Sequence, residues 1–213
     1  MCLKIKGTKQ KLLLVKIKKG KAISFKKTRA DIVERELLNR FRPTWMVESI
    51  YDLSPEQLKK QGIKVVLTDL DNTLIAWDNP SGTPQLHEWL KEMRKAKIPV
   101  VVVSNNKHER IKKALDELSL PFIARALKPL TRGINVALKR YHVKRSEVVL
   151  VGDQLMTDVL AANNAQIKSI LVRPLVDSDA WNTKINRFFE RLVKKRLVKT
   201  NRLSTKWGHK LDD

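Results

Sequence analysis

Along the middle of the chain, the arrangement of apolar residues alternates between two patterns. Short apolar runs rich in β-branched residues predict buried strands, and stretches with apolar residues at helical spacing separate them. The predicted strands cover residues 63–67, 98–103, 121–124, 148–151 and 167–172. The predicted helices cover residues 31–40, 54–61, 84–95, 107–118, 131–142 and 155–163. This alternation predicts an α/β fold with a Rossmann-like, mostly parallel sheet and helices on both faces.

Four residues with charged or hydroxyl side chains stand just beyond the carboxyl ends of predicted strands. They are Asp69, Ser104, Lys128 and Asp153. Sheets of this kind bind ligands in the crevice outside the carboxyl ends of their strands. We therefore expect the four residues to contribute to one site.

Asp69 and Asp71 lie two residues apart directly after the first of these strands, so both carboxylates can be aimed at one point. One carboxylate can attack phosphorus and form an acyl-phosphate, while the other protonates the leaving oxygen and later activates water. The Thr73 hydroxyl can orient that second carboxylate. Ser104 and Lys128 can balance the charge on the phosphoryl oxygens.

Asp153 and Asp158 supply the hard oxygen ligands that Mg²⁺ prefers. A metal ion there would also reduce the repulsion between an attacking carboxylate and a phosphate group. The sequence therefore predicts a magnesium-assisted phosphoryl-transfer site.

The chain resembles the haloacid dehalogenase-like (HAD) phosphatases in four motifs that occur in the expected order. They are Asp69-Leu70-Asp71-Asn72-Thr73, Val103-Ser104-Asn105, Leu127-Lys128-Pro129 and Gly152-Asp153-Gln154-Leu155-Met156-Thr157-Asp158. The resemblance implies that Asp69 is the nucleophile and Asp71 the acid/base. The phosphate-binding residues that it implies are Ser104, Asn105, Lys128 and Thr73. The metal ligands that it implies are Asp69, Asp71 (through its backbone carbonyl), Asp153 and Asp158.

Residues 41–195 are most similar to the YqeG type of this family, class IIIA. Relatives of this type include a mitochondrial phosphatidylglycerophosphate phosphatase, so the resemblance implies a phospholipid substrate. The chain departs from the family at Ala161-Ala162-Asn163-Asn164, where a glycine pair and an arginine are common. The departure removes backbone freedom and one phosphate contact.

The intervals between motifs leave no room for a cap domain. Thirty residues separate Thr73 from Ser104, and 23 separate Ser104 from Lys128. A strand–helix crossover uses nearly all of either interval. An uncapped site is open, which favours a large substrate such as a lipid headgroup, a protein or a nucleic-acid end.

The net charge of +22 is concentrated at the two ends of the chain. Residues 1–30 contain eleven Lys or Arg and no acid, and residues 181–213 contain ten against three acids. We divide the chain into a basic N-terminal arm (1–30), a phosphatase domain (31–180) and a basic C-terminal helix and tail (181–213). Apolar residues at helical spacing from Trp181 predict a basic amphipathic helix, which can pack on the domain or bind an anionic membrane surface.

The only cysteine is Cys2, so an internal disulfide is excluded, and no apolar run approaches the roughly 20 residues of a membrane span. A cytoplasmic protein, peripheral on the inner face of the membrane, is the expectation. The leading hypothesis is dephosphorylation of phosphatidylglycerophosphate. One alternative is a phosphatase for nucleic-acid ends or phosphoproteins, and another is an RNA- or ribosome-binding protein with a vestigial HAD site.

Overall fold

The computed structural model describes residues 28–76, 82–176 and 184–211. Nearly all of the predicted basic arm, residues 1–30, therefore lies outside the described residues, as does Trp181 at the predicted start of the C-terminal helix.

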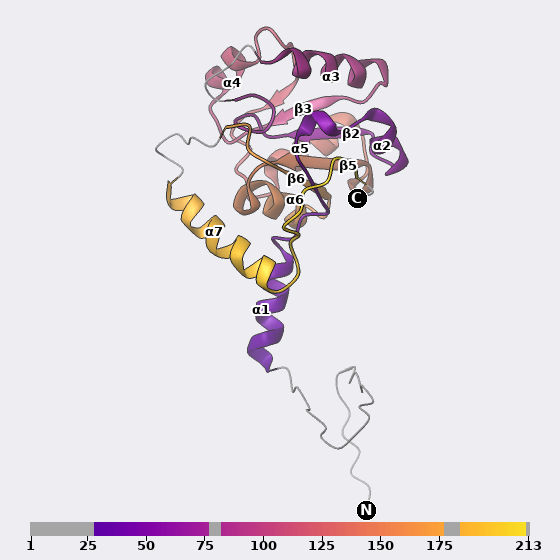
Figure 1. Ribbon diagram of the computed structural model, residues 1–213. Helices are drawn as coiled ribbons and strands as arrows, with labels where there is room; N and C mark the ends of the chain where they lie inside the picture. Colours follow the sequence, from indigo (N-terminus) through magenta and orange to yellow (C-terminus); the bar gives the residue numbers. More distant parts are fainter. Residues whose placement is uncertain (1–27, 77–81, 177–183, 212–213) are drawn as a thin grey trace, which may run out of the picture.

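A six-stranded sheet forms the centre of the described molecule, and all of its strand pairs are parallel (Figure 1). The strands are β1 (Trp45–Val47), β2 (Val65–Thr68), β3 (Val100–Val103), β4 (Phe122–Ile123), β5 (Val148–Gly152) and β6 (Lys168–Val172). Their spatial order is β1-β6-β5-β2-β3-β4. Strands β2, β3 and β5 are buried along their whole length, as their continuous Val and Leu runs require in a sheet covered on both faces.

The strand order reverses at β2, which pairs with β3 on one side and with β5 on the other. The chain runs outward from β2 through β3 to β4 and then returns to β5. Such a reversal opens a crevice beyond the carboxyl ends of the two strands at which it occurs. Asp69 and Asp153 lie at that point, because they directly follow β2 and β5.

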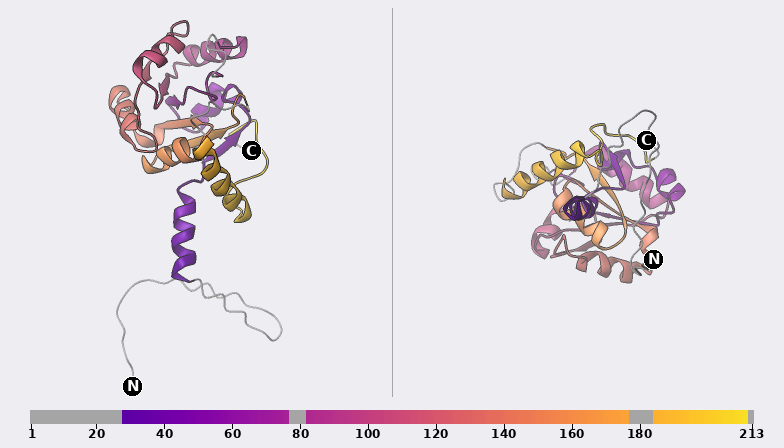
Figure 2. Two further views of the ribbon diagram at one scale, coloured as in Figure 1. Left: turned by 90° about the vertical axis from the view of Figure 1, so that its left-hand side faces the viewer. Right: turned by 90° about the horizontal axis from the view of Figure 1, so that it is seen from below.

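The helices form layers on both faces of the sheet (Figures 1 and 2). They are α1 (Arg29–Asn39), α2 (Pro55–Lys60), α3 (Pro84–Lys95), α4 (His108–Ala114), α5 (Arg132–Tyr141), α6 (Leu160–Asn164) and α7 (Lys184–Lys199), with short 3₁₀ turns at Ile50–Asp52 and Arg145–Glu147 and a π-helical turn, η3, at Leu155–Val159. Apolar residues of α3 and α4 pack with Val66 on one face, and those of α5 and α6 pack with Leu67 on the other.

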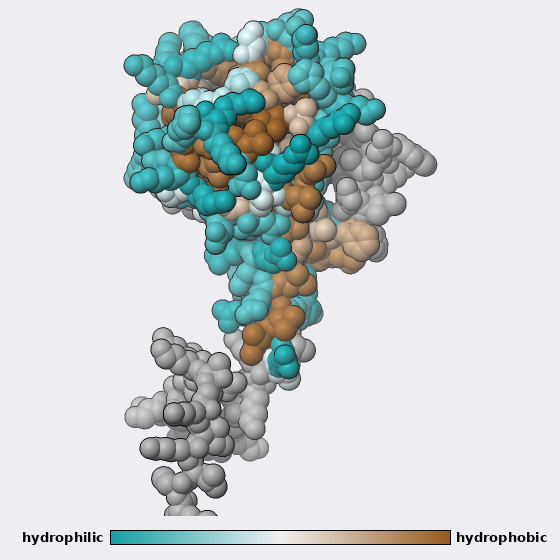
Figure 3. Space-filling model, turned by 180° about the vertical axis from the view of Figure 1, so that it is seen from behind, coloured by the Kyte–Doolittle hydropathy of each residue, from teal (hydrophilic) through white to brown (hydrophobic). Residues whose placement is uncertain are grey.

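A third apolar cluster joins the two ends of the described chain to the edge of the sheet. Leu38 of α1 and Leu197 of α7 meet in it with Leu155, Val159 and Leu171. Beyond this contact α1 projects away from the sheet and exposes aliphatic side chains, which contribute to the apolar surface on the projecting part of the molecule in Figure 3. These side chains are Ile32, Val33 and Leu37.

The end of the chain returns to the sheet at its β1 edge. Gly208 forms a parallel bridge with Val47, donates its N–H to Met46 and accepts the N–H of Glu48. Leu211 is then buried in the main core. One edge of the sheet is thus covered by the C-terminal segment.

The predicted α/β fold class is confirmed, and the helix at 84–95 has the predicted bounds. The sequence pattern missed β1, which has three residues, and it predicted one helix where η3 and α6 follow each other. The only helix described between Thr73 and Ser104 is α3, in keeping with the uncapped site that the short interval predicts. Across 28–76, 82–176 and 184–211, each helix is too short or too polar to cross a bilayer.

Candidate active site

Asp69 and Asp71 occupy a tight turn at the carboxyl end of β2. The Asp69 N–H continues the sheet by donating to Val151, and the Asn72 N–H closes the turn by donating to Ile75 at 2.8 Å. Asn72 has φ of 60°, a left-handed conformation that Asn adopts more readily than most residues. The turn therefore presents two carboxylates beyond the strand.

Lys128 is the buried cation of the site. Its Nζ lies 2.8 Å from Oδ1 of Asp69 and 2.6 Å from Oδ1 of Asp158, and only 3% of its side chain is exposed. Burial acts to lower the pKa of Lys128, but the attraction of Asp158 and Asp69 outweighs it and holds this pKa above its usual value. Lys128 is therefore a permanently charged group between two acidic ones.

The loop that carries Lys128 is fastened by Asn105. The Lys128 N–H donates to Oδ1 of Asn105 at 2.7 Å, and Nδ2 of Asn105 donates to the Lys128 carbonyl at 2.9 Å. This pair of bonds joins the loop after β3 to the segment that precedes α5. It fixes the backbone from which the buried amine reaches the carboxylates.

Asp158 enters the site from the π-helical turn η3, directly over Gly152. A Cβ atom at Gly152 would lie 2.2 Å from Cγ of Asp158, so only glycine lets this carboxylate approach the end of β5. Oδ2 of Asp158 accepts the Gln154 N–H at 3.2 Å. The neighbouring Asp153 accepts a hydrogen bond from the Thr73 hydroxyl at 3.1 Å.

Asp69, Asp153 and Asp158 can each place one oxygen within 4.8 Å of the others. Burial, reinforced by repulsion from Asp158 and Asp69, raises the pKa of Asp153 well above its usual value. Burial also raises the pKa of Asp158 to about 6, against the opposing attraction of Lys128. Three crowded carboxylate oxygens fit a hard divalent cation, which would relieve this repulsion.

Asp71 lies outside that cluster and is held by two donors. Asn106 donates to its Oδ2 at 2.7 Å, and Arg110 donates to its Oδ1 at 2.9 Å. Arg110 also donates to Asn106 at 2.8 Å, so the three side chains form a closed triangle. This triangle fixes the direction of the Asp71 carboxylate.

The structure brings the predicted residues to one end of the sheet but gives two of them different contacts. The Thr73 hydroxyl was expected to orient Asp71, and it binds Asp153 instead. The side-chain amide of Asn105, expected at the phosphate, binds the Lys128 backbone. Ser104 is buried, and its hydroxyl accepts the Asn106 N–H at 3.2 Å. The roles in catalysis, phosphate binding and metal binding remain predictions.

Three residues at the site were not predicted from the sequence. Asn106 adjoins the Ser104-Asn105 motif, and Arg110 stands one helical turn later, so adjacency to a motif was the available signal. Glu190 of α7 gave no such signal. Its carboxylate accepts the N–H groups of Leu155 and Met156, at 2.5 and 3.4 Å, in the turn that carries Asp158.

Comparison with known proteins gives a consistent set of similarities. The sequence of residues 10–166 matches the family model of the haloacid dehalogenase-like hydrolases. The chain is 42% identical over 153 residues to the Bacillus subtilis (strain 168) protein named Probable phosphatase YqeG. The alignment covers 72% of this chain and 89% of that protein.

Two solved structures are similar at lower identity. An uncharacterized protein from Listeria monocytogenes serotype 4b is 18% identical, with a TM-score of 0.45, over 62% of this chain and 99% of that one. A protein from Legionella pneumophila, named as a putative HAD superfamily (subfamily III A) hydrolase, is 17% identical, with a TM-score of 0.35, over 46% of this chain and 60% of that one.

Proposed function

Because the chain belongs to the haloacid dehalogenase-like hydrolases, we propose that it is a Mg²⁺-dependent phosphomonoesterase that forms an aspartyl-phosphate on Asp69. We further propose that its substrate is a phosphorylated lipid headgroup, that of phosphatidylglycerophosphate, at an anionic membrane surface. The predictions of the HAD family, of its YqeG type and of a phosphatase are confirmed by the comparisons. The roles of the site residues, the metal and the substrate are the part that we propose.

The carboxylate of Asp69 is the nucleophile. Its oxygen forms a bond to phosphorus while the bond from phosphorus to the ester oxygen breaks, and Asp71 gives a proton to that oxygen. In the second half Asp71 takes a proton from water, which attacks the aspartyl-phosphate and releases phosphate. Asn106 and Arg110 each donate to one oxygen of Asp71, and each oxygen keeps a second lone pair at which the transferred proton can be held.

Lys128 places a fixed positive charge beside the nucleophile, 2.8 Å from Asp69. That charge stabilises the phosphoryl oxygens as well as the carboxylate, and burial strengthens the effect. Asp69, Asp153 and Asp158 would hold Mg²⁺, which supplies positive charge that offsets the repulsion between carboxylate and phosphate.

The observation that favours a lipid substrate is the position of α7 against the active-site turn. Glu190 accepts two N–H groups of η3, while neighbouring apolar residues of the helix, Phe189 and Leu192, are 51% and 49% exposed. Exposed basic residues surround them on α7, namely Arg191, Lys194 and Lys195. Near an anionic surface each basic residue contributes about 1 kcal/mol. A helix of this kind would hold the open site at the headgroups.

Phosphate release from phosphatidylglycerophosphate vesicles, measured with and without Mg²⁺, tests the proposal. We expect Asp69→Asn to abolish turnover and excess chelator to suppress it, while the exposed Asp116→Asn leaves it unchanged. Full activity of Asp69→Asn would refute the mechanism. Turnover of a 3′-phosphate oligonucleotide without turnover of the vesicles would refute the assignment of phosphatidylglycerophosphate as the substrate.

The contribution of α7 has its own test. Leu192→Glu should lower turnover of vesicles and leave turnover of a soluble aryl phosphate unchanged. Val136→Glu, on the exposed side of α5, is the matched control and should affect neither. Equal vesicle activity in the wild type and Leu192→Glu would show that α7 does not hold the enzyme at the lipid.

A further inference from the structure

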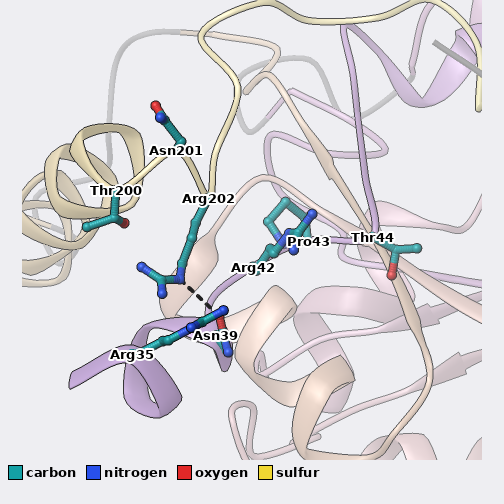
Figure 4. Close-up of a pocket in the computed structure, with 8 residues that line it drawn as sticks. All are labelled: Arg35, Asn39, Arg42, Pro43, Thr44, Thr200, Asn201 and Arg202. Atoms are coloured by element: carbon teal, nitrogen blue, oxygen red, sulfur yellow. Dashed lines mark hydrogen bonds between the residues drawn. The ribbon is translucent and has the colours of Figure 1, made fainter. Parts of the chain in front are cut away.

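A polar cavity lies at the opposite end of the sheet from the active-site residues. Its volume is about 470 Å³, and it is formed where the end of α1, the segment entering β1 and the turn after α7 meet (Figure 4). Thr44, on its wall, directly precedes β1 and therefore marks the amino ends of the strands. The active-site residues follow the carboxyl ends, so the cavity is a separate site.

Three arginines line the cavity, and no Asp or Glu is among its described lining residues. Arg35 comes from α1, Arg42 from the turn that follows it, and Arg202 from the turn after α7. A guanidinium keeps its charge at every physiological pH and presents a planar fork of donors that matches phosphate oxygens. The wall of the cavity therefore carries three permanent positive charges.

Most of the guanidinium donors are available to a ligand. Within the described ranges, Arg35 and Arg42 make no side-chain hydrogen bond or ion pair, whereas Arg202 uses its Nε to donate to Asn39 at 3.0 Å. Figure 4 shows Arg35 and Arg202 reaching toward Asn39 from two sides. The nearby Glu34 forms its ion pair with Arg196, and its carboxylate also attracts Arg202 without a hydrogen bond to it.

The backbone on both sides of the cavity is fixed. The Asn201 N–H donates to Val198 and the Arg202 N–H to Leu197, which closes α7 with Asn201 in the left-handed conformation, at φ of 54°. On the other side, Thr44 exchanges hydrogen bonds with Ser169, and the Arg42 carbonyl accepts from Asn163 at 2.9 Å. The arginines therefore stand on positioned supports.

We propose that this cavity binds a small anion with two linked phosphate groups. A diphosphate balances three guanidinium charges, whereas one phosphate group balances about two of them. Amide and hydroxyl groups of Asn39, Asn201 and Thr44 add neutral donors. The described lining residues include no aromatic ring on which a base would stack, so the phosphates are the recognised part.

Titration of the ¹⁵N-labelled full chain with inorganic pyrophosphate locates the ligand. The experiment uses chelator to remove metal and about 0.15 M salt to screen weak surface contacts. We expect saturable shifts of the amide signals of Thr44, Asn201 and Arg202. Shifts confined to the active-site loops, or the absence of saturation at these three amides, would overturn the proposal.

The double variant Arg35→Gln/Arg42→Gln should weaken binding by roughly tenfold for each guanidinium removed, the order expected for a hydrogen bond to a charged group. Lys139→Gln/Arg140→Gln, which removes two positive charges from exposed positions on α5, should leave the dissociation constant unchanged. The double variant should also keep wild-type turnover of a soluble ester, so failure here is distinct from failure of the phosphatase. An unchanged dissociation constant in the double variant would refute the site.

Orthophosphate in a parallel titration distinguishes a linked pair of phosphates from a single group. We expect it to bind at least roughly tenfold more weakly than pyrophosphate, because it reaches fewer of the three guanidinium groups. Equal affinity for the two anions would overturn the assignment of a diphosphate. Arg35→Lys/Arg42→Lys keeps the charge and loses the fork, so binding as tight as in the wild type would show that the guanidinium geometry is not used.

Discussion

Replacing Lys128 with Met removes one buried positive charge and keeps most of the apolar stem. The lost ammonium lies 2.8 Å from Asp69 and 2.6 Å from Asp158, and the Asp158 side chain is only 1% exposed. Removing one partner of a buried ion pair costs about 3–5 kcal/mol, because the remaining charge is left desolvated. At about 2–4 °C per kcal/mol for a chain of this size, we expect Tm to fall by roughly 10 °C.

Thermal and urea unfolding at pH 7.5 in chelator measure this loss. The control is Lys91→Met, which breaks an exposed pair with Glu88 and should cost less than about 1 kcal/mol. If Lys128→Met unfolds no more easily than Lys91→Met, the ammonium does not hold the two carboxylates together.

A second substitution separates lost charge from lost packing. Asp158→Asn added to Lys128→Met removes one of the two unpaired charges, so the double variant should be more stable than Lys128→Met alone. Mg²⁺ should also raise the Tm of Lys128→Met, because the oxygens of Asp69, Asp153 and Asp158 fit a divalent cation. A double variant less stable than the single one would contradict the electrostatic explanation.

Three further outcomes are expected. In chelator the folded state keeps protons on Asp153 and Asp158 that the unfolded chain has lost, so the free energy of unfolding should fall as pH rises from about 4 through 6. Asp158→Asn should make Tm depend less steeply on pH. A steeper dependence in this variant would contradict the role of Asp158. Arg110→Gln should change the pH profile of kcat on a soluble ester, because it frees one oxygen of Asp71; an unchanged profile would show that the contact is incidental. Asn72→Ala should lower stability by about 1 kcal/mol because of its positive φ, whereas Asn72→Gly should not; equal Tm values would exclude backbone strain.

Much of the fold could be predicted because the apolar pattern is strong where burial is complete. The Val and Leu runs of β2, β3 and β5 are buried on both faces. Asp69, Ser104 and Asp153 follow these strands directly, so they lie together at the carboxyl ends of the sheet. β1 has three residues and partly exposed side chains, so its pattern is too short to recognise.

The contacts that refine the site could not be predicted in the same way. Glu190 meets Leu155 from 35 positions away in the sequence, and nothing near Glu190 indicates that pairing. Thr73 reaches Asp153 across 80 positions because the turn after β2 faces the end of β5. Motif spacing identifies which residues gather, whereas the hydrogen-bond partner depends on side-chain directions that only the folded chain defines.

The return of Gly208 to β1 has a consequence for how chains behave toward one another. A bare edge strand offers unpaired N–H and C=O groups to any other strand, which favours edge-to-edge association. Here those groups of Met46 and Glu48 are already used within the chain. The segment that contains Gly208 therefore hinders the pairing of β1 with a strand of another chain. Removing this segment would leave the β1 edge free for such pairing and favour aggregation.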